Sequence, residues 1–138
     1  MVKNNFFQLI YTSKPSPQLT EKSMIDILVD AQQYNQQEVI SGFLLYSSEK
    51  LIQLIEGDEV NVMDLFHKIK KDKRHYDIII RHSGFVDKRC MPCLGMGLCF
   101  LEETNHQDHH FYFTRSEAKN FSTLIKGHIG EIFGKYLD

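Results

Sequence analysis

Short apolar runs of the kind that form buried strands recur along the first hundred residues of the chain. They predict strands at residues 5–11, 39–46, 50–56, about 76–86 and 91–100. Only Ser47-Ser48-Glu49 separates the second run from the third, and this short connection is typical of an antiparallel hairpin. Alternation within the strands predicts that Leu51, Gln53 and Ile55 share one sheet face, and that Phe7, Leu9 and Tyr11 share one face.

Two segments between these strands show helical spacing instead. Thr20 is suited to cap the first helix, whose apolar stripe consists of Met24, Ile27, Leu28, Ala31 and, at its end, Asn35. Asp58 can cap the second helix, whose stripe consists of Val62, Leu65, Phe66 and Ile69 and leads on to Asp72. Asn35 is therefore expected on the buried face of its helix.

The resulting order, β-α-β-β-α-β-β, predicts an α+β fold with a ferredoxin-like sheet and one added strand. Two helices would cover one face of this sheet. Residues 116–137 carry a wide apolar stripe with helical punctuation, so C-terminal helices are expected on the other face. We expect residues 1–100 to form the main unit and residues 101–138 to be a helical extension packed on the sheet, within the same domain.

Composition narrows the class of protein. The chain has 138 residues, 42% of them apolar and 25% charged, which fits one soluble domain. A net charge of −2 gives no electrostatic reason to expect nucleic acid or an anionic membrane as partner. No run approaches the ~20 apolar residues of a membrane span, and no secretory signal is evident. Three cysteines crowded between Cys90 and Cys99 are a poor disulfide framework, so a cytoplasmic location is expected.

Three polar residues lie where a packed sheet normally holds apolar ones: Tyr11, Asn35 and Gln53. Each would cost roughly 1–3 kcal/mol if buried without a partner, so they should converge on something that exchanges hydrogen bonds with them. Taken singly, each has an ordinary interpretation, as a core-edge tyrosine, a helix C-terminal asparagine and a sheet glutamine. Likewise Asp72-Lys-Arg-His75 alone is a charged helix exit. Their joint order and spacing favour a binding site.

The same residues carry a family resemblance. The matching segments, in order, are Leu9-Ile-Tyr11-Thr-Ser13, Asn35, Ile40-Ser-Gly42 with Leu44, Gln53-Leu-Ile-Glu-Gly57, Asp72-Lys-Arg-His75 and Met96-Gly97. Over about residues 5–100 they closely resemble the BLUF family, the sensors of blue light using flavin. Gln-Leu-Ile-Glu-Gly at this distance from Asp-x-Arg-His is the most specific part of the match.

The resemblance implies an FAD held non-covalently between the two helices and the sheet. The cofactor-binding residues that it implies are Ile27, Asn35, Leu51, Gln53, Ile69, Asp72, Arg74 and His75. Asn35 would bond the polar edge of the ring, Ile27 and Ile69 would sandwich it, and Arg74 and His75 would meet a ring carbonyl or the ribityl chain. Leu51 stands where the family usually has phenylalanine.

The implied function is that of a blue-light photoreceptor, not an enzyme. Tyr11, Gln53 and Met96 would form the photochemical switch. Light-driven electron and proton transfer from Tyr11 would rearrange Gln53, whose carboxamide has a donor end and an acceptor end. The new hydrogen bonding to the flavin would shift its absorption to the red. Whether Gln53 rotates or tautomerises stays open.

One departure from the family is Leu94, which occupies the usual tryptophan position in a chain without tryptophan. This removes a competing electron donor and leaves transmission through Met96 and the last strand to the C-terminal helices. We expect a short, stand-alone member whose altered surface is read by a downstream signalling protein. By analogy only, a homo-oligomer is also expected.

A flavin-free interaction module with the same fold is the main alternative, and a small FAD-dependent redox enzyme is weaker because no substrate signal accompanies it. Cys90 and Cys93, with His106, His109 and His110, resemble parts of a zinc site. The odd spacing of the two thiols on a strand would point them to opposite faces, so no metal site is expected.

Overall fold

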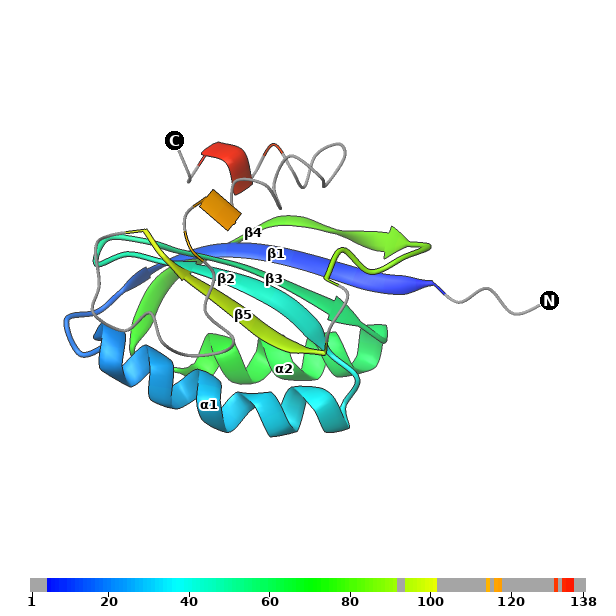
Figure 1. Ribbon diagram of the computed structural model, residues 1–138, viewed down its shortest axis with the longest axis horizontal. Coiled ribbons are helices and arrows are strands. Elements are labelled where there is room, and N and C mark those ends of the chain that lie inside the picture. Colours follow the sequence, from blue (N-terminus) through cyan, green and yellow to red (C-terminus); the bar gives the residue numbers. More distant parts are fainter. Residues whose placement is uncertain are drawn as a thin grey trace.

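The computed structural model describes residues 5–91, 94–101, 114, 116–117, 131 and 133–135. In chain order its elements are β1 (Phe6–Pro15), α1 (Glu21–Gln37), β2 (Ser41–Tyr46), β3 (Leu51–Gly57), α2 (Glu59–Lys71), β4 (His75–Val86) and β5 (Gly95–Phe100). Figure 1 shows α1 and α2 side by side on one side of the sheet, with the red helical segment near the C-terminus on the other. The predicted α+β class with two helices on one face is confirmed.

The five strands lie in the order β4-β1-β3-β2-β5. β1 runs antiparallel to both of its neighbours, β3 and β4, and β2 and β3 form the predicted antiparallel hairpin. β5 adds to the outer side of β2 and runs parallel to it. The first four strands thus have the ferredoxin-like arrangement, and β5 is the added strand at one edge.

Helix α1 begins at a capping box. The Thr20 side chain accepts a hydrogen bond from the Ser23 amide at 3.2 Å, and the Ser23 hydroxyl accepts one from the Thr20 amide at 2.7 Å. The buried residues of the helix are Met24, Ile25, Leu28 and Asn35. Asn35 therefore lies on the inner face, as the stripe predicts.

Helix α2 is capped by Asp58, whose carboxylate accepts from the Val60 amide at 3.2 Å. Its buried residues, Val62 and Phe66, pack on the β1–β3 half of the sheet in one cluster with Phe7, Leu9, Tyr11, Ile40 and Ile55. The predicted alternation of β1 and β3 is thereby confirmed, because Phe7, Leu9 and Tyr11 of β1 and Ile55 of β3 all lie in the cluster of this helix.

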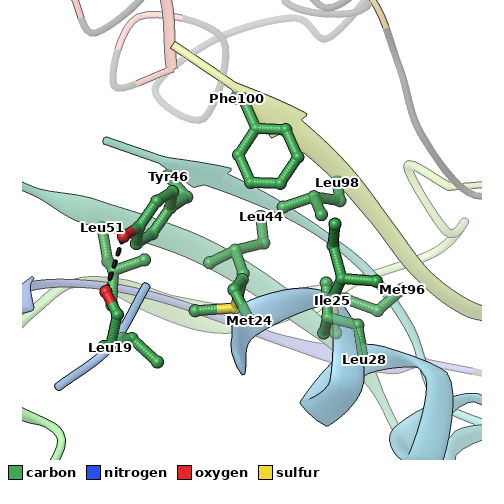
Figure 2. Close-up of a cluster of buried hydrophobic side chains, with 10 residues drawn as sticks. All are labelled: Leu19, Met24, Ile25, Leu28, Leu44, Tyr46, Leu51, Met96, Leu98 and Phe100. Carbon is green, nitrogen blue, oxygen red and sulfur yellow. Dashed lines mark hydrogen bonds between the residues drawn. The ribbon is translucent and has the colours of Figure 1, made fainter. Parts of the chain in front are cut away.

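We call the side of the sheet that carries α1 and α2 the helix face, and the opposite side the far face. A second cluster on the helix face fills the space between α1 and the β2–β5 half of the sheet, and Figure 2 shows its members. The far face has its own apolar cluster, formed by Ile10, Phe43, Leu45, Ile52, Leu54, Met91, Cys99 and Phe133. The sheet thus has a buried apolar cluster on each side.

The C-terminal segment reaches the far face through Phe133. This side chain is fully buried, and its ring centroid lies 6.0 Å from that of Phe43. Residues 116–117, 131 and 133–135 are helical, whereas the rest of the segment predicted to be helical lies outside the described residues.

Two sequence predictions about element boundaries are wrong. β1 continues to Pro15 instead of ending at residue 11, because Ser13 and Lys14 pair with Leu51 and Tyr76 on the neighbouring strands. β5 begins at Gly95 rather than at residue 91, so Cys90 lies in the preceding loop and not on a strand. The strand argument about the two thiols therefore fails for Cys90, and Cys93 lies outside the described residues.

Candidate functional site

A pocket lies between the two helices and the helix face of the sheet, with about 130 Å³ accessible to water. Every site residue expected from the sequence lines it: Tyr11, Ile27, Asn35, Leu51, Gln53, Ile69, Asp72, Arg74, His75 and Met96. These residues come from all the strands and helices except β2, so the tertiary fold brings together positions that are far apart along the chain.

Tyr11, Gln53 and Met96 form a continuous chain of side-chain hydrogen bonds. The Tyr11 hydroxyl donates to Gln53 Oε1, and Gln53 Nε2 donates to the Met96 sulfur at 3.4 Å. The β1–β3 register places Tyr11 directly opposite Gln53, so the first contact follows from strand pairing. The two ends of the carboxamide therefore face different partners, with the acceptor end toward Tyr11 and the donor end toward Met96.

Tyr11 is only 3% exposed, which excludes the interpretation of a tyrosine with its hydroxyl in water. Burial first, and the negative charge of Asp72 second, raise the pKa of Tyr11 above its ordinary value. The ring is held by Phe66 and His75, with centroids 5.5 and 6.2 Å away. Tyr11 consequently keeps its proton at neutral pH and acts as a fixed hydrogen-bond donor.

Asn35 is 1% exposed, and its Oδ1 atom has no hydrogen-bond partner among the described residues. An unmet buried acceptor of this kind costs about 1–3 kcal/mol. Two other buried atoms share this condition, Gln8 Oε1 and Ser16 Oγ, but neither residue lines the pocket. Asn35 Oδ1 is thus an acceptor at the pocket that a ligand with an N–H or O–H group could satisfy.

The polar end of the pocket is formed by the residues that follow α2. Arg74 donates to the Asp72 carboxylate through Nη2 at 2.6 Å and through Nε at 2.9 Å. These bonds hold the pKa of Asp72 below its usual range. The guanidinium is thus placed by Asp72 at the mouth of the pocket, where it keeps its charge.

Both ring nitrogens of His75 have partners. Nε2 lies 2.7 Å from the Ile69 carbonyl and Nδ1 lies 2.8 Å from the Ser13 hydroxyl. A carbonyl can only accept, so Nε2 donates and Nδ1 can accept from Ser13 in the neutral ring. A polar contact from His75 to a ligand would require it to give up one of these bonds.

The remaining wall is apolar. The lining residues not assigned to the site from the sequence are Leu19, Met24, Leu28, Ala31, Leu44 and Leu65. Four of them belong to the predicted helix stripes, and period-2 alternation indicates the helix face for Leu44. Leu19 gave no such signal, because it is placed by the Tyr46 hydroxyl, which donates to its carbonyl at 2.6 Å (Figure 2).

Leu94, at the position where the resemblance leads one to expect tryptophan, is 38% exposed and is not among the lining residues. It lies just before the start of β5. The pocket in this structure is therefore completed at that end by Met96 and not by residue 94.

A second buried polar cluster, which the sequence analysis missed, lies on the far face around Glu56. This side chain is fully buried. Its Oε1 accepts from Ser41 Oγ at 3.0 Å and the Met91 amide at 2.6 Å, and its Oε2 accepts from Gln8 Nε2 and the Cys90 amide, both at 2.9 Å. Strand alternation could have predicted that Glu56 lies on the sheet face away from Gln53. No local pattern in the sequence reveals the hydrogen-bond partners of Glu56.

In the described part of the chain, no three metal-ligating side chains group together, while Cys93, His106, His109 and His110 lie outside it. No helix among the described residues is both long enough and apolar enough to span a bilayer.

The fold and the pocket define an α+β domain with a candidate ligand site between its helices and its sheet. The family model of BLUF, described as sensors of blue-light using FAD, matches residues 6–97. The chain therefore belongs to the BLUF family, and the predicted family is confirmed. The expected cofactor, FAD, is the one that defines this family.

Curated relatives are longer proteins. The chain is 30% identical over 84 residues to the photoactivated adenylate cyclase subunit beta of Euglena longa, covering 61% of this chain and 10% of the relative. It is 32% identical over 100 residues to the blue light- and temperature-regulated antirepressor BluF of Escherichia coli strain K12, covering 72% of this chain and 25% of that protein. The chain thus spans about a tenth to a quarter of the length of these relatives.

Among solved structures, the photo-activated state of BlsA is similar over nearly the whole chain. The TM-score is 0.68 at 25% sequence identity, with 96% of this chain and 94% of that chain covered. The predicted light-sensing function is confirmed at the level of the family, which is described as sensors of blue-light using FAD.

The residues of the pocket fit a flavin. Asn35 Oδ1 provides an unmet acceptor, and a flavin ring carries an N–H donor on its polar edge. Ile27 on α1 and Ile69 on α2 present apolar side chains to the same pocket, which suits the flat faces of an aromatic ring. Gln53 and Arg74 provide donors for ring oxygens.

Proposed function

We propose that this protein senses blue light through a switch made of Tyr11 and Gln53, with FAD held in the helix-face pocket. The single observation that carries the proposal is the Tyr11–Gln53–Met96 hydrogen-bond chain, which is buried and lines the pocket. These bonds fix the orientation of the Gln53 carboxamide in the dark, and light would change that orientation or its donor and acceptor ends.

In this proposal Asn35, Ile27, Ile69, Leu51 and Arg74 hold the cofactor. FAD, when bound, supplies the absorption of blue light and an excited acceptor for an electron and a proton. Tyr11 can give up both, because its hydroxyl is protonated and already donates to Gln53 Oε1. Both return to Tyr11 within the cycle, so the net change is confined to the hydrogen bonds of Gln53.

The rearranged Gln53 no longer matches its neighbours. If its carboxamide turns over, Nε2 leaves the Met96 sulfur and faces Tyr11, while Oε1 faces a sulfur that has no hydrogen to donate. If it tautomerises, the donor and acceptor ends exchange without rotation. In both cases the contact with Met96 on β5 changes, and this change can pass into the edge of the sheet.

The output proposed here is a change in a surface that another protein or a second copy of the chain reads. Residues 1–100 form the sensor unit and residues 101–138 an extension of the same domain. The burial of Phe133 against Phe43 supports this, because it ties the C-terminal segment to the far face of the sheet. Light scattering of the purified protein in the dark and under blue light tests whether the reader is a second copy.

The experiment for the switch is a visible absorption spectrum recorded before and after blue illumination and then followed in darkness. We expect a yellow protein whose flavin band shifts reversibly to the red without bleaching. Tyr11→Phe and Gln53→Leu should keep bound flavin and lose the shift, whereas Tyr76→Phe, at an exposed position on β4, should behave as wild type.

Two results would contradict the proposal. A Tyr11→Phe variant that keeps the full reversible shift would remove Tyr11 from the mechanism. A wild-type protein that purifies without flavin and shows no light-minus-dark difference would instead match a flavin-free interaction module.

A further inference from the structure

Gln32 on α1 forms a two-point hydrogen bond with the backbone of Met96. Its Nε2 donates to the Met96 carbonyl at 2.9 Å, and its Oε1 accepts from the Met96 amide at 3.0 Å. A single side chain thus satisfies both backbone groups of the residue whose sulfur contacts Gln53. Gln32 was not assigned a role from the sequence, and it does not line the pocket.

The position of β5 explains why this contact is available. Among the described strands, β5 is one of the two edge strands of the sheet, and its only neighbouring strand is β2. The Gly95 amide donates inward to the Ile40 carbonyl at 2.9 Å. Because backbone groups of successive strand residues point to opposite sides, the amide and carbonyl of Met96 face the outer edge. There the Gln32 carboxamide takes the place of a further strand.

The side chain of Gln32 approaches the backbone closely at Gly95, the residue before Met96. Its φ is 110°, which L-residues with a side chain rarely adopt. A Cβ atom built on Gly95 would lie 2.2 Å from Gln32 Oε1. Both the backbone conformation and the approach of Gln32 therefore require glycine at this position.

The side chain of Met96 is fixed as well. A Cβ atom on Gly42 of β2 would lie 2.7 Å from the Met96 methyl group and 2.9 Å from its sulfur, so the missing side chain of Gly42 leaves the room that Met96 occupies. In this slot the sulfur accepts from Gln53 Nε2. Two carboxamides therefore form hydrogen bonds with Met96: that of Gln53 bonds its side chain, and that of Gln32 bonds its backbone.

We propose that Gln32 is a positioning residue of the switch, which holds the backbone of Met96 so that its sulfur meets the Gln53 amide and which links that contact to α1. This inference rests on the proposed function, because it concerns the same Gln53 rearrangement. It predicts that the dark arrangement of Gln53 is favoured in part by Gln32, although the two side chains share no direct contact.

The test uses the full, flavin-loaded chain with three variants. Gln32→Met keeps the length of the side chain and removes both hydrogen bonds, whereas Gln32→Glu keeps only the acceptor. Gln33→Met, on the exposed side of the same helix, is the matched control. Amide hydrogen exchange of Met96 reports on the clamp, and the rate of dark recovery after blue light reports on the switch.

We expect Gln32→Met to lower protection of the Met96 amide by about tenfold or more, equivalent to at least about 1.4 kcal/mol. It should slow dark recovery by about fivefold, equivalent to roughly 1 kcal/mol. Gln32→Glu should keep most of the amide protection and show a smaller change in recovery. Gln33→Met should match wild type in both measurements.

A double-mutant cycle separates positioning from general loosening of the strand. Met96→Leu removes the sulfur acceptor while conserving volume, so adding Gln32→Met should change recovery no further. Additive effects, or a Gln32→Met protein that loses amide protection but recovers at the wild-type rate or faster, would overturn the inference. A wild-type protein without any reversible red shift would remove the proposed function itself, which is a different outcome.

Discussion

The two faces of the sheet both bury polar side chains, but they satisfy them differently. On the far face the Glu56 carboxylate receives four hydrogen bonds, two from side chains and two from backbone amides of the loop before β5. On the helix face Tyr11 and Gln53 pair with each other, while Asn35 Oδ1 has no partner among the described residues. All four hydrogen bonds to the Glu56 carboxylate come from within the protein, whereas Asn35 has an unmet acceptor at a pocket.

This difference separates a structural polar cluster from a binding site. Four donors directed at one carboxylate fix the loop to the sheet, and removing the carboxylate takes this acceptor away from all four. An unmet acceptor beside a cavity instead destabilises the ligand-free protein, and a ligand that donates a hydrogen bond to it removes this free-energy cost. The burial of polar side chains alone would have indicated a binding site at both clusters equally. Only the hydrogen-bond partners of those side chains distinguish the two.

The largest effect is expected from Glu56→Ala. This change takes the acceptor from the side chains of Gln8 and Ser41 and from two backbone amides, so the free energy of unfolding should fall by about 3–5 kcal/mol. Urea unfolding of the flavin-free protein measures it. Asn35→Ala on the helix face is the matched comparison and should cost less than about 1 kcal/mol, because the lost oxygen had no partner. Equal losses at the two positions would refute the distinction between the faces.

Gly95→Ala, at the sheet edge, should lower the free energy of unfolding by about 2–4 kcal/mol. The cost combines the positive φ with the close approach of Gln32. In a Gln32→Ala background it should fall to about 1–2 kcal/mol, the part due to the backbone alone. Gly84→Ala on β4 is the control, since the nearest atom to its Cβ would be 4.0 Å away. Thermal or urea unfolding of wild type and these four variants decides the outcome.

Asn35→Ala should weaken FAD binding about tenfold, equivalent to about 1.4 kcal/mol, because the ligand loses its buried acceptor. Fluorescence titration of the flavin-free protein measures the dissociation constant. Asn61→Ala serves as control, since the Asn61 amide donates to the Glu38 carbonyl and the residue does not line the pocket. An unchanged dissociation constant for Asn35→Ala would show that FAD does not use this oxygen.

The smallest expected effect concerns pH. Burial raises the pKa of Tyr11 in the folded protein, so the folded state holds its proton while the unfolded state releases it above the ordinary tyrosine pKa of about 10. Stability from this group is therefore complete below that pH and is lost as pH rises, by up to about 1.4 kcal/mol per pH unit. Urea unfolding at about pH 9 and 11 should show a steeper loss for wild type than for Tyr11→Phe. Parallel losses would mean that Tyr11 ionises in the folded protein.

Much of the fold was predictable from local patterns. Thr20 and Asp58 start their helices through capping, which depends on residues two or three positions away. Asn35 ends a stripe of helical spacing, and Gln53 alternates with Leu51 and Ile55, so each was placed on its correct face. Boundaries were less predictable: β1 extends to Pro15 because Ser13 and Lys14 find partners on other strands.

The sequence by itself determined the helices, the strand faces and the polar residues of the pocket, because these depend on spacing along the chain. Only the tertiary structure decided what each polar group meets. Gln32 meets Met96 sixty-four positions away, and Glu56 meets Cys90 and Met91 thirty-four and thirty-five positions away. Such contacts arise from strand order, from the parallel addition of β5 and from the path of the loop before it. No local pattern encodes them, since hydrogen-bond partners are chosen by geometry after the chain has folded.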